Sequence, residues 1–141
     1  MSKNKENDTS TKTVRLKGKV FSGSGEGAYF TMLPWVRQQI KEKLGFAPYP
    51  GTLNVRLVGE YVGVRKLLEN AKAIEISPEH GYCSGKCFKA RVGGQNLACA
   101  VVLPCVENYP MDILEIIAPS NLREKLGLRD GDEVEVRITL E

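Results

Sequence analysis

The sequence has no long hydrophobic run, few aromatic residues and a single histidine. No apolar stretch approaches the ~20 residues that a membrane-spanning helix needs. The N-terminal stretch Met1–Lys12 is polar and has no apolar core of the kind found in signal peptides. Because almost nothing in residues 1–12 could bury apolar surface, we expect a disordered tail there. Residues 13–141 suffice for one domain with a single core, and we expect the protein to be cytoplasmic.

Cysteine is also scarce, and its spacing lacks any C-x-x-C pair. The four cysteines are Cys83, Cys87, Cys99 and Cys105. His80 lies just before the first two, which leaves a structural zinc site as an alternative. The segment from Cys99 to Cys105, however, has the composition of a buried strand. We therefore predict free cysteines that pack as small apolar residues in a reducing compartment.

Charge of either sign is not concentrated anywhere in the chain. The net charge is +3, with 42% hydrophobic and 26% charged residues, which is ordinary for a globular protein. A nucleic-acid-binding protein usually carries a denser basic cluster, so this balance neither requires nor excludes one. It does suit a pocket for anionic ligands.

Alternation of apolar and polar residues predicts several short strands. The strand candidates are Thr13–Phe21, Thr52–Leu57, Ala73–Ile76, Phe88–Val92, Leu97–Leu103, Asp112–Ala118 and Val134–Ile138. Helices are predicted over Pro34–Leu44, ended by Gly45, over Val62–Asn70, and over Ser120–Lys125, capped by Ser120 and ended by Gly127. Ser84-Gly85 is predicted to form a hairpin turn. Without a regular βαβ alternation, this order predicts a small closed barrel of six or seven strands with two or three short helices.

The glycine-rich stretch Gly23–Phe30 follows the first predicted strand and is the most distinctive local feature. Glycines at alternate positions let backbone N–H groups approach an anion closely, because no Cβ stands in the way. A phosphate-binding loop is therefore one interpretation, and a plain turn is the alternative. The stretch matches neither the Walker A pattern nor the G-x-G-x-x-G dinucleotide fingerprint.

Three other groups of polar residues lie within or beside predicted strands and helices and are candidates for ligand binding. Thr52 and Asn54 share one strand face and offer two neutral oxygen ligands suited to Mg²⁺, unless that face is simply solvated. Ser120–Arg123 opens a helix with free N–H groups and a guanidinium, either as an anion site or as plain capping. Glu115 interrupts an apolar strand, where burial without a purpose is costly; the alternative is that it faces solvent.

These segments together resemble the archaeal CTP-dependent riboflavin kinases. The resemblance rests on Gly18–Phe30, Leu44–Asn54, Glu115–Arg123 and Leu128–Asp132, in family order and spacing, and covers about Val14 to Ile138. It implies a mainly β fold, namely a small closed six-stranded β-barrel of the cradle-loop type. It also implies transfer of the γ-phosphoryl group of CTP to the 5′-hydroxyl of riboflavin, giving FMN and CDP.

The resemblance also implies a role for each matching position. Nucleotide binding carries over to Ser24, Gly25, Glu26, Gly27, Ala28 and Tyr29 and to Ser120, Asn121, Leu122 and Arg123. The resemblance assigns the binding of one Mg²⁺ to Thr52 and Asn54, and it assigns a contact with the flavin to Glu115. Glu115 is also our hypothesis for the base that accepts the hydroxyl proton. The alternative is that no strong base is needed, since the transition state is largely dissociative.

One position departs from the family pattern. Similar members commonly have a flavin-contacting threonine where this chain has Glu107, so the resemblance assigns Glu107 to flavin binding with an altered contact. The cysteines are not part of the family pattern.

The partners implied are CTP or CDP and riboflavin or FMN, with no membrane and no nucleic acid, and we expect a monomer. Some relatives carry an N-terminal winged-helix domain, and the residues before the first predicted strand are too few for one. A small barrel that binds DNA or a partner protein is the alternative, because Leu126–Val136 also resembles barrels of that kind.

Overall fold

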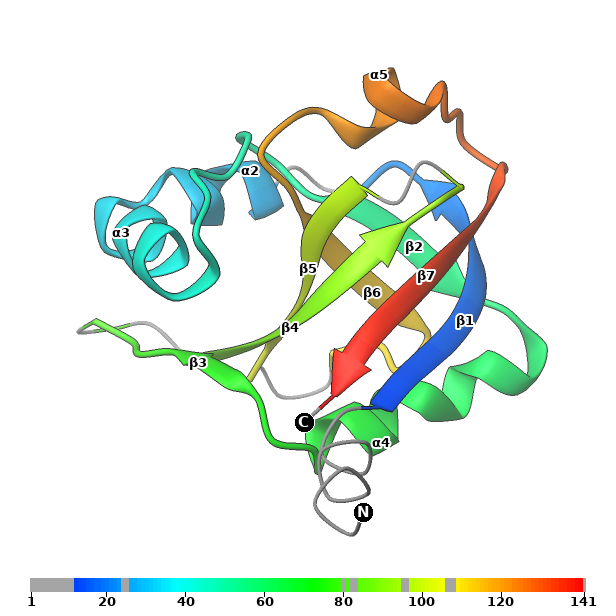
Figure 1. Ribbon diagram of the computed structural model, residues 1–141, viewed down its shortest axis with the longest axis horizontal. Helices are drawn as coiled ribbons and strands as arrows, with labels where there is room; N and C mark the ends of the chain where they lie inside the picture. The colour runs from blue at the N-terminus through cyan, green and yellow to red at the C-terminus, as the bar shows by residue number, and fades with distance from the viewer. Residues whose placement is uncertain are drawn as a thin grey trace, which may run out of the picture.

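Seven antiparallel strands form one sheet that closes on itself. The computed structural model describes residues 12–23, 26–79, 81, 84–94, 97–105 and 109–140. The strands are β1 (Lys12–Phe21), β2 (Leu53–Leu57), β3 (Ile74–Ile76), β4 (Gly85–Val92), β5 (Leu97–Pro104), β6 (Ile113–Ile117) and β7 (Glu133–Leu140). Their order is β3-β4-β5-β6-β2-β1-β7, and β7 also pairs with β4. That pairing closes six strands into a barrel and leaves β3 as an extra strand beside β4 (Figure 1). The predicted six-stranded barrel is confirmed.

The barrel interior is filled by every second residue of its strands, as the period of two requires. Leu16 of β1, Val55 of β2, Leu114 of β6 and Val136 of β7 are all fully buried in this cluster. Burial of each such side chain stabilises the fold by about 1.5–3 kcal/mol relative to leaving it exposed. The intervening residues of β2, Asn54 and Arg56, therefore lie on the outer face of the barrel.

Four α-helices and one 3-10 turn lie between the strands in the described part of the chain. They are α2 (Glu26–Met32), α3 (Pro34–Leu44), α4 (Val64–Glu69) and α5 (Leu122–Leu126), with a 3-10 turn, η1, at Gly59–Gly63. The described part of the chain thus holds four α-helices, whereas the sequence predicts two or three. The additional one is α2, which occupies much of the stretch predicted as a glycine-rich loop. The prediction for α3 is confirmed, since it begins at Pro34 and ends at Gly45, where φ is 86°.

A second apolar cluster joins α3 to the outside of the barrel. Val36 and Ile40 of α3 pack with Ile76, Cys87, Ala100, Val102 and Ile117 of the sheet. Phe30 of α2 meets Trp35 of α3 edge to face, with ring centroids 6.1 Å apart. These contacts fix α2 and α3 on one side of the barrel, as Figure 1 shows.

The two ends of the barrel are covered by different helices, with α4 at one end and α5 at the opposite end (Figure 1). Leu68 of α4 is fully buried in the barrel cluster. Of the predicted site residues, Asn54 lies near the start of β2 and Glu115 in the middle of β6, and the chain runs from the end of β6 to α5. None of the helices in the described ranges has the length and hydrophobicity that a membrane-crossing helix requires.

Three local predictions are wrong. Gly85 does not belong to a hairpin turn, because it is the first residue of β4 and pairs with Ile76 and Pro104. Cys87 and Cys99 are free and buried as predicted, but Cys105 lies beyond the end of β5 and is exposed. Cys83, His80 and residues 1–11 of the expected tail at 1–12 lie outside the described residues. The expected boundary of the tail is wrong at Lys12, because Lys12 is the first residue of β1 and pairs with Leu140 of β7.

Candidate active site

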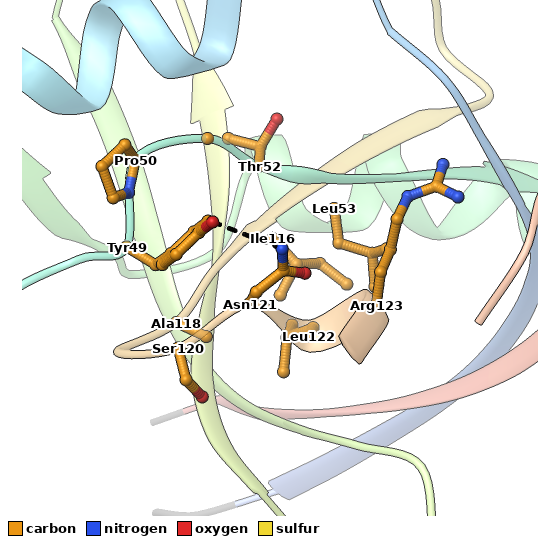
Figure 2. Close-up of a pocket in the computed structure, with 11 residues that line it drawn as sticks. Tyr49, Pro50, Thr52, Leu53, Ile116, Ala118, Ser120, Asn121, Leu122 and Arg123 are labelled. Atoms are coloured by element: carbon orange, nitrogen blue, oxygen red, sulfur yellow. Dashed lines mark hydrogen bonds between the residues drawn. The ribbon is translucent and has the colours of Figure 1, made fainter. Parts of the chain in front are cut away.

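A pocket of about 180 Å³ opens between the segment that enters β2 and the segment that links β6 to α5. Figure 2 shows these two segments facing each other across it, with Tyr49 and Pro50 on one side and Asn121 and Arg123 on the other. Asn121 Nδ2 donates to Tyr49 Oη at 3.4 Å across the pocket. The residues that line it are Tyr49, Pro50, Gly51, Thr52, Leu53, Ile116, Ala118, Ser120, Asn121, Leu122 and Arg123. All four predicted residues of the second nucleotide segment, 120–123, therefore lie beside Thr52.

Backbone and helix contacts hold the segment that enters β2. Tyr49 N donates to the carbonyl of Ala118 at 2.7 Å, which joins the two sides of the pocket. Arg37 of α3 donates to the carbonyl of Pro48 at 3.2 Å. Gly51 adopts φ 122°, a value that strongly favours glycine. The pocket wall is thus fixed by both the barrel and α3.

Thr31 connects α2 to the same wall and was not predicted as a site residue. Its side chain is fully buried. Thr31 Oγ1 donates to the carbonyl of Ala28 at 3.1 Å and accepts from the N–H of Gly51 at 3.0 Å. The glycine-rich stretch is therefore linked to the residue just before Thr52, although no local pattern in the sequence marks Thr31 for this contact.

Thr52 and Asn54 lie on one face, as predicted, because Leu53 and Val55 between and beside them point into the core. Asn54 pairs with Phe21 of β1 on one side and with Glu115 of β6 on the other. A Cβ placed on Gly23 would lie only 2.5 Å from Asn54 Nδ2. The start of the glycine-rich stretch is therefore packed directly against the predicted metal ligand.

Glu115 lies on β6 beside Asn54 of β2 and Val102 of β5. It is partly buried, and both of its carboxylate oxygens accept hydrogen bonds. Thr52 Oγ1 donates to Oε1 at 3.1 Å, and the Tyr109 hydroxyl donates to Oε2. The carboxylate is thus held on the same face as the two predicted metal ligands.

Arg123 is tied to the neighbouring turn. Its Nη2 donates to Asp130 Oδ1 at 2.6 Å, and Ser22 Oγ donates to Asp130 Oδ2 at 2.8 Å. Hydrogen bonds from Arg123, and then from Ser22, lower the pKa of the exposed Asp130 carboxyl below its ordinary value of 3.8. This cluster links α5, the turn before β7 and the end of β1.

Comparison with known proteins identifies the family of this chain. A family model named CTP-dep_RFKase and described as "Domain of unknown function DUF120" matches residues 20–138. The chain belongs to the CTP-dependent riboflavin kinase family. The resemblance inferred from the sequence motifs is therefore confirmed.

Several proteins named riboflavin kinase are similar to this member of the CTP-dependent riboflavin kinase family. That of Archaeoglobus fulgidus is 46% identical over 132 residues, which cover 91% of this chain and 56% of that protein. Those of Pyrobaculum arsenaticum and Methanosarcina barkeri are 42% and 43% identical, covering 91% and 89% of this chain. The chain spans only 62% and 56% of the lengths of these two relatives.

The structure brings together only part of the site that the family pattern predicts. Ser24, Gly25 and Glu107 lie outside the described residues. Glu26 and Gly27 belong to the first turn of α2, so the loop prediction is wrong from residue 26 onward. Ala28 is half-buried and Tyr29 is 63% exposed, both on α2. Residues 120–123, by contrast, line one pocket with Thr52, and Glu115 is joined to Thr52 by a hydrogen bond.

The cap of α5 differs from the prediction. Asn121, and not Ser120, caps the helix, since Asn121 Oδ1 accepts from the N–H of Glu124 at 3.3 Å. Gly127 ends the helix as predicted, with φ 64°. Leu122 is buried and anchors α5 to the barrel core.

Proposed function

We propose that this chain is the barrel of a CTP-dependent riboflavin kinase, which transfers the γ-phosphoryl group of CTP to the 5′-hydroxyl of riboflavin and yields FMN and CDP. Membership of the family supports the proposal. The observation that carries it is the 3.1 Å hydrogen bond between Thr52 and Glu115 at the edge of the pocket. That bond supports the proposal, because it joins Thr52, which the family motif assigns to the metal, to Glu115, which the motif assigns to the flavin. Phosphoryl donor and acceptor must meet at such a boundary.

The pocket suits one part of the nucleotide. Its volume of about 180 Å³ is smaller than the roughly 300–1,000 Å³ of typical ligand pockets. We therefore assign the pocket to a portion of CTP, held by polar groups of 120–123. Arg123 retains donors for a phosphate, because a guanidinium carries five N–H groups and the Asp130 bond uses one of them.

Thr52 and Asn54 form a donor set that fits a magnesium ion. Both offer neutral oxygens, the ligand type that Mg²⁺ takes together with waters and phosphate oxygens. The Glu115 carboxylate on the neighbouring strand adds negative charge on the same face. When bound, the divalent cation offsets the charge of the phosphoryl group under transfer. Thr52 and Asn54 would hold this cation on the strand face that they share with Glu115.

Glu115 is assigned to the flavin side of the site, where it receives the hydroxyl of riboflavin. Each carboxylate oxygen has two lone-pair positions, so the bonds from Thr52 and Tyr109 leave acceptor capacity for a substrate hydroxyl. Glu115 can orient the 5′-hydroxyl, and as a base it can take the proton released on transfer.

A chromatographic assay for FMN tests the proposal. The protein is incubated with riboflavin and Mg²⁺, with CTP, ATP, GTP or UTP supplied in parallel. We expect FMN chiefly with CTP, and a loss of at least about 100-fold in Asn54→Ala, since positioning dominates this transfer. The matched control Asn70→Ala changes an exposed asparagine at the end of α4 and should leave the rate unchanged.

Failure to form FMN with any nucleotide, in protein shown to be folded, overturns the proposal and favours a binding barrel without catalysis. The same assay on Glu115→Gln assigns the carboxylate. Loss of turnover with normal riboflavin affinity indicates a base, whereas near-normal turnover with weaker riboflavin binding indicates a binding residue only.

A further inference from the structure

Arg65 of α4 is a buried charge that the proposed reaction does not use. Only 2% of it is exposed. Arginine is seldom fully buried unless it is paired, since removal of a charge from water is costly. Its Nη1 donates to the carbonyl of Ile113 at the start of β6, at 2.8 Å. Its Nε lies 3.6 Å from Glu69 Oε2, too far for a hydrogen bond, and within the described residues Nε has no hydrogen-bond partner.

The guanidinium of Arg65 lies over the ring of Tyr109, 4.4 Å from its centroid. A cation at this distance from an aromatic face is attracted to the ring. The hydroxyl at the far end of the same ring donates to Glu115, and Glu115 accepts from Thr52. Continuous contacts therefore run from Arg65 of α4 through Tyr109 and Glu115 to the pocket residue Thr52.

This arrangement determines the direction of the Thr52 hydroxyl. A threonine hydroxyl has one hydrogen and two lone pairs. Because the hydrogen points to Glu115, the lone pairs face away from Glu115 and are available to a cation. A glutamate side chain has several rotatable bonds, and the Tyr109 hydroxyl restrains its second oxygen. Partners of this kind, one step removed from the ligand, orient metal ligands in many proteins.

We propose that Tyr109 and Arg65 are positioning residues for the metal side of the site. Arg65 fixes the Tyr109 ring, Tyr109 fixes Glu115, and Glu115 orients the Thr52 hydroxyl toward the bound cation. This inference rests on the proposed function, because Thr52 and Asn54 are assigned to the cation there. It adds two residues that lie outside the pocket and that the family motifs in the sequence did not indicate.

The test is the variant Tyr109→Phe, which keeps the ring under Arg65 and removes only the hydroxyl. Two measurements are made: binding of Mn²⁺ in the presence of CDP, from the electron paramagnetic resonance signal of free Mn²⁺, and kcat for FMN formation. We expect both Mn²⁺ affinity and kcat to fall about 10-fold or more. Thermal unfolding should be nearly unchanged, since the ring that lies under the Arg65 guanidinium is retained.

A matched control and a second variant sharpen the test. Tyr61→Phe removes a hydroxyl from another partly buried tyrosine, in η1, and should leave both measurements unchanged. Arg65→Lys keeps the charge but not the planar stacking group, and should shift Mn²⁺ affinity in the same direction as Tyr109→Phe. This variant serves if Tyr109→Phe does not fold.

Wild-type Mn²⁺ affinity and kcat in folded Tyr109→Phe would overturn the inference. Unchanged Mn²⁺ affinity in folded Arg65→Lys would overturn the part assigned to Arg65. The proposed function fails separately, if the wild-type protein forms no FMN. In that case the Mn²⁺ measurements still decide whether Tyr109 positions a cation site.

Discussion

Gly23 lies against the side chain of Asn54, and this contact restricts where the assigned metal ligand can point. A Cβ on Gly23 would come within 2.5 Å of Nδ2 and 2.9 Å of Cγ of Asn54. Real Cβ atoms do not approach other atoms so closely, so the Asn54 side chain would have to move. Glycine is required at position 23 because any larger residue would overlap the side chain of Asn54.

We therefore predict that Gly23→Ala lowers the rate of FMN formation by about 10- to 100-fold, because a displacement of about 1 Å can cost 100-fold in rate. The FMN assay and circular dichroism together check this, with the fold expected to remain intact. Gly63→Ala is the control, since a Cβ there meets nothing within 4 Å and φ is −70°. An alanine variant at Gly23 as active as the wild type would show that Asn54 tolerates displacement.

The sequence predicted the face shared by Thr52 and Asn54, because a period of two follows directly from alternation of apolar residues. It also predicted Glu115 as a polar residue with a purpose. It could not predict the partners of these side chains. Thr52 and Glu115 are 63 residues apart, and Ser22 and Asp130 are 108 apart. Such contacts depend on strand order and register, which no local pattern specifies.

The short helix α5 presents 120–123 to the pocket, so its cap matters for the site. Asn121 Oδ1 bonds the N–H of Glu124, while the preceding Ser120 lies in the pocket wall. We predict that Asn121→Ala costs about 1 kcal/mol of unfolding free energy, the typical value of a helix cap. Ser120→Ala should stay within about 0.5 kcal/mol of the wild type. Urea unfolding of the two variants, side by side, measures the difference.

The opposite ranking, with Ser120→Ala the less stable variant, would contradict the assignment of the cap. The sequence allowed either residue, since serine and asparagine are both strong caps. Which of the two precedes the first helical turn depends on where the chain leaves Ala118, whose carbonyl accepts from Tyr49 N.

Helix α2 shows why the glycine-rich stretch is helical from residue 26 onward, where the sequence predicts a loop. Glycine lowers helix propensity by about 1 kcal/mol relative to alanine, so Gly25 and Gly27 favour a loop prediction. Tertiary contacts decide otherwise. Phe30 packs against Trp35 and the second apolar cluster, and the buried Thr31 bonds Gly51. Neither contact can be inferred from the segment itself.

The described cysteines differ in burial, and we expect them to differ in reactivity for that reason. Burial raises the pKa of the Cys87 and Cys99 thiols to about 12, and nearby Lys43 and Arg91, respectively, offset only part of this effect. Cys105 is exposed. Because the thiolate is the reactive form, the two buried thiols are unreactive while the barrel is closed.

We predict that iodoacetamide at pH 8 alkylates Cys105 in the native protein, whereas Cys87 and Cys99 react only as fast as the barrel opens. Peptide mapping by mass spectrometry distinguishes the sites. In urea above the unfolding transition, all three should react at similar rates. Alkylation of Cys87 in the native protein as fast as that of Cys105 would show that the second apolar cluster opens locally.

The sequence predicts a closed barrel, but it does not predict which two strands pair to close it. The seam is the pairing of β4 with β7 over three residue pairs, from Ala90–Ile138 to Val92–Val136. Alternation marks both strands in the sequence, yet it does not say which strands become neighbours. That choice follows from how the interior side chains fill one common core.

The pairing of β7 with β1 has a consequence for how the protein is made. β7 is the last of the seven strands to leave the ribosome, yet it pairs with β1, the first, over eight residue pairs. Until residues 133–140 emerge, the nascent sheet has open edges on β1 and β4, and such edges can pair with other chains. The order of synthesis therefore delays completion of this barrel to its final strand, and protection of those edges during translation becomes part of its biogenesis.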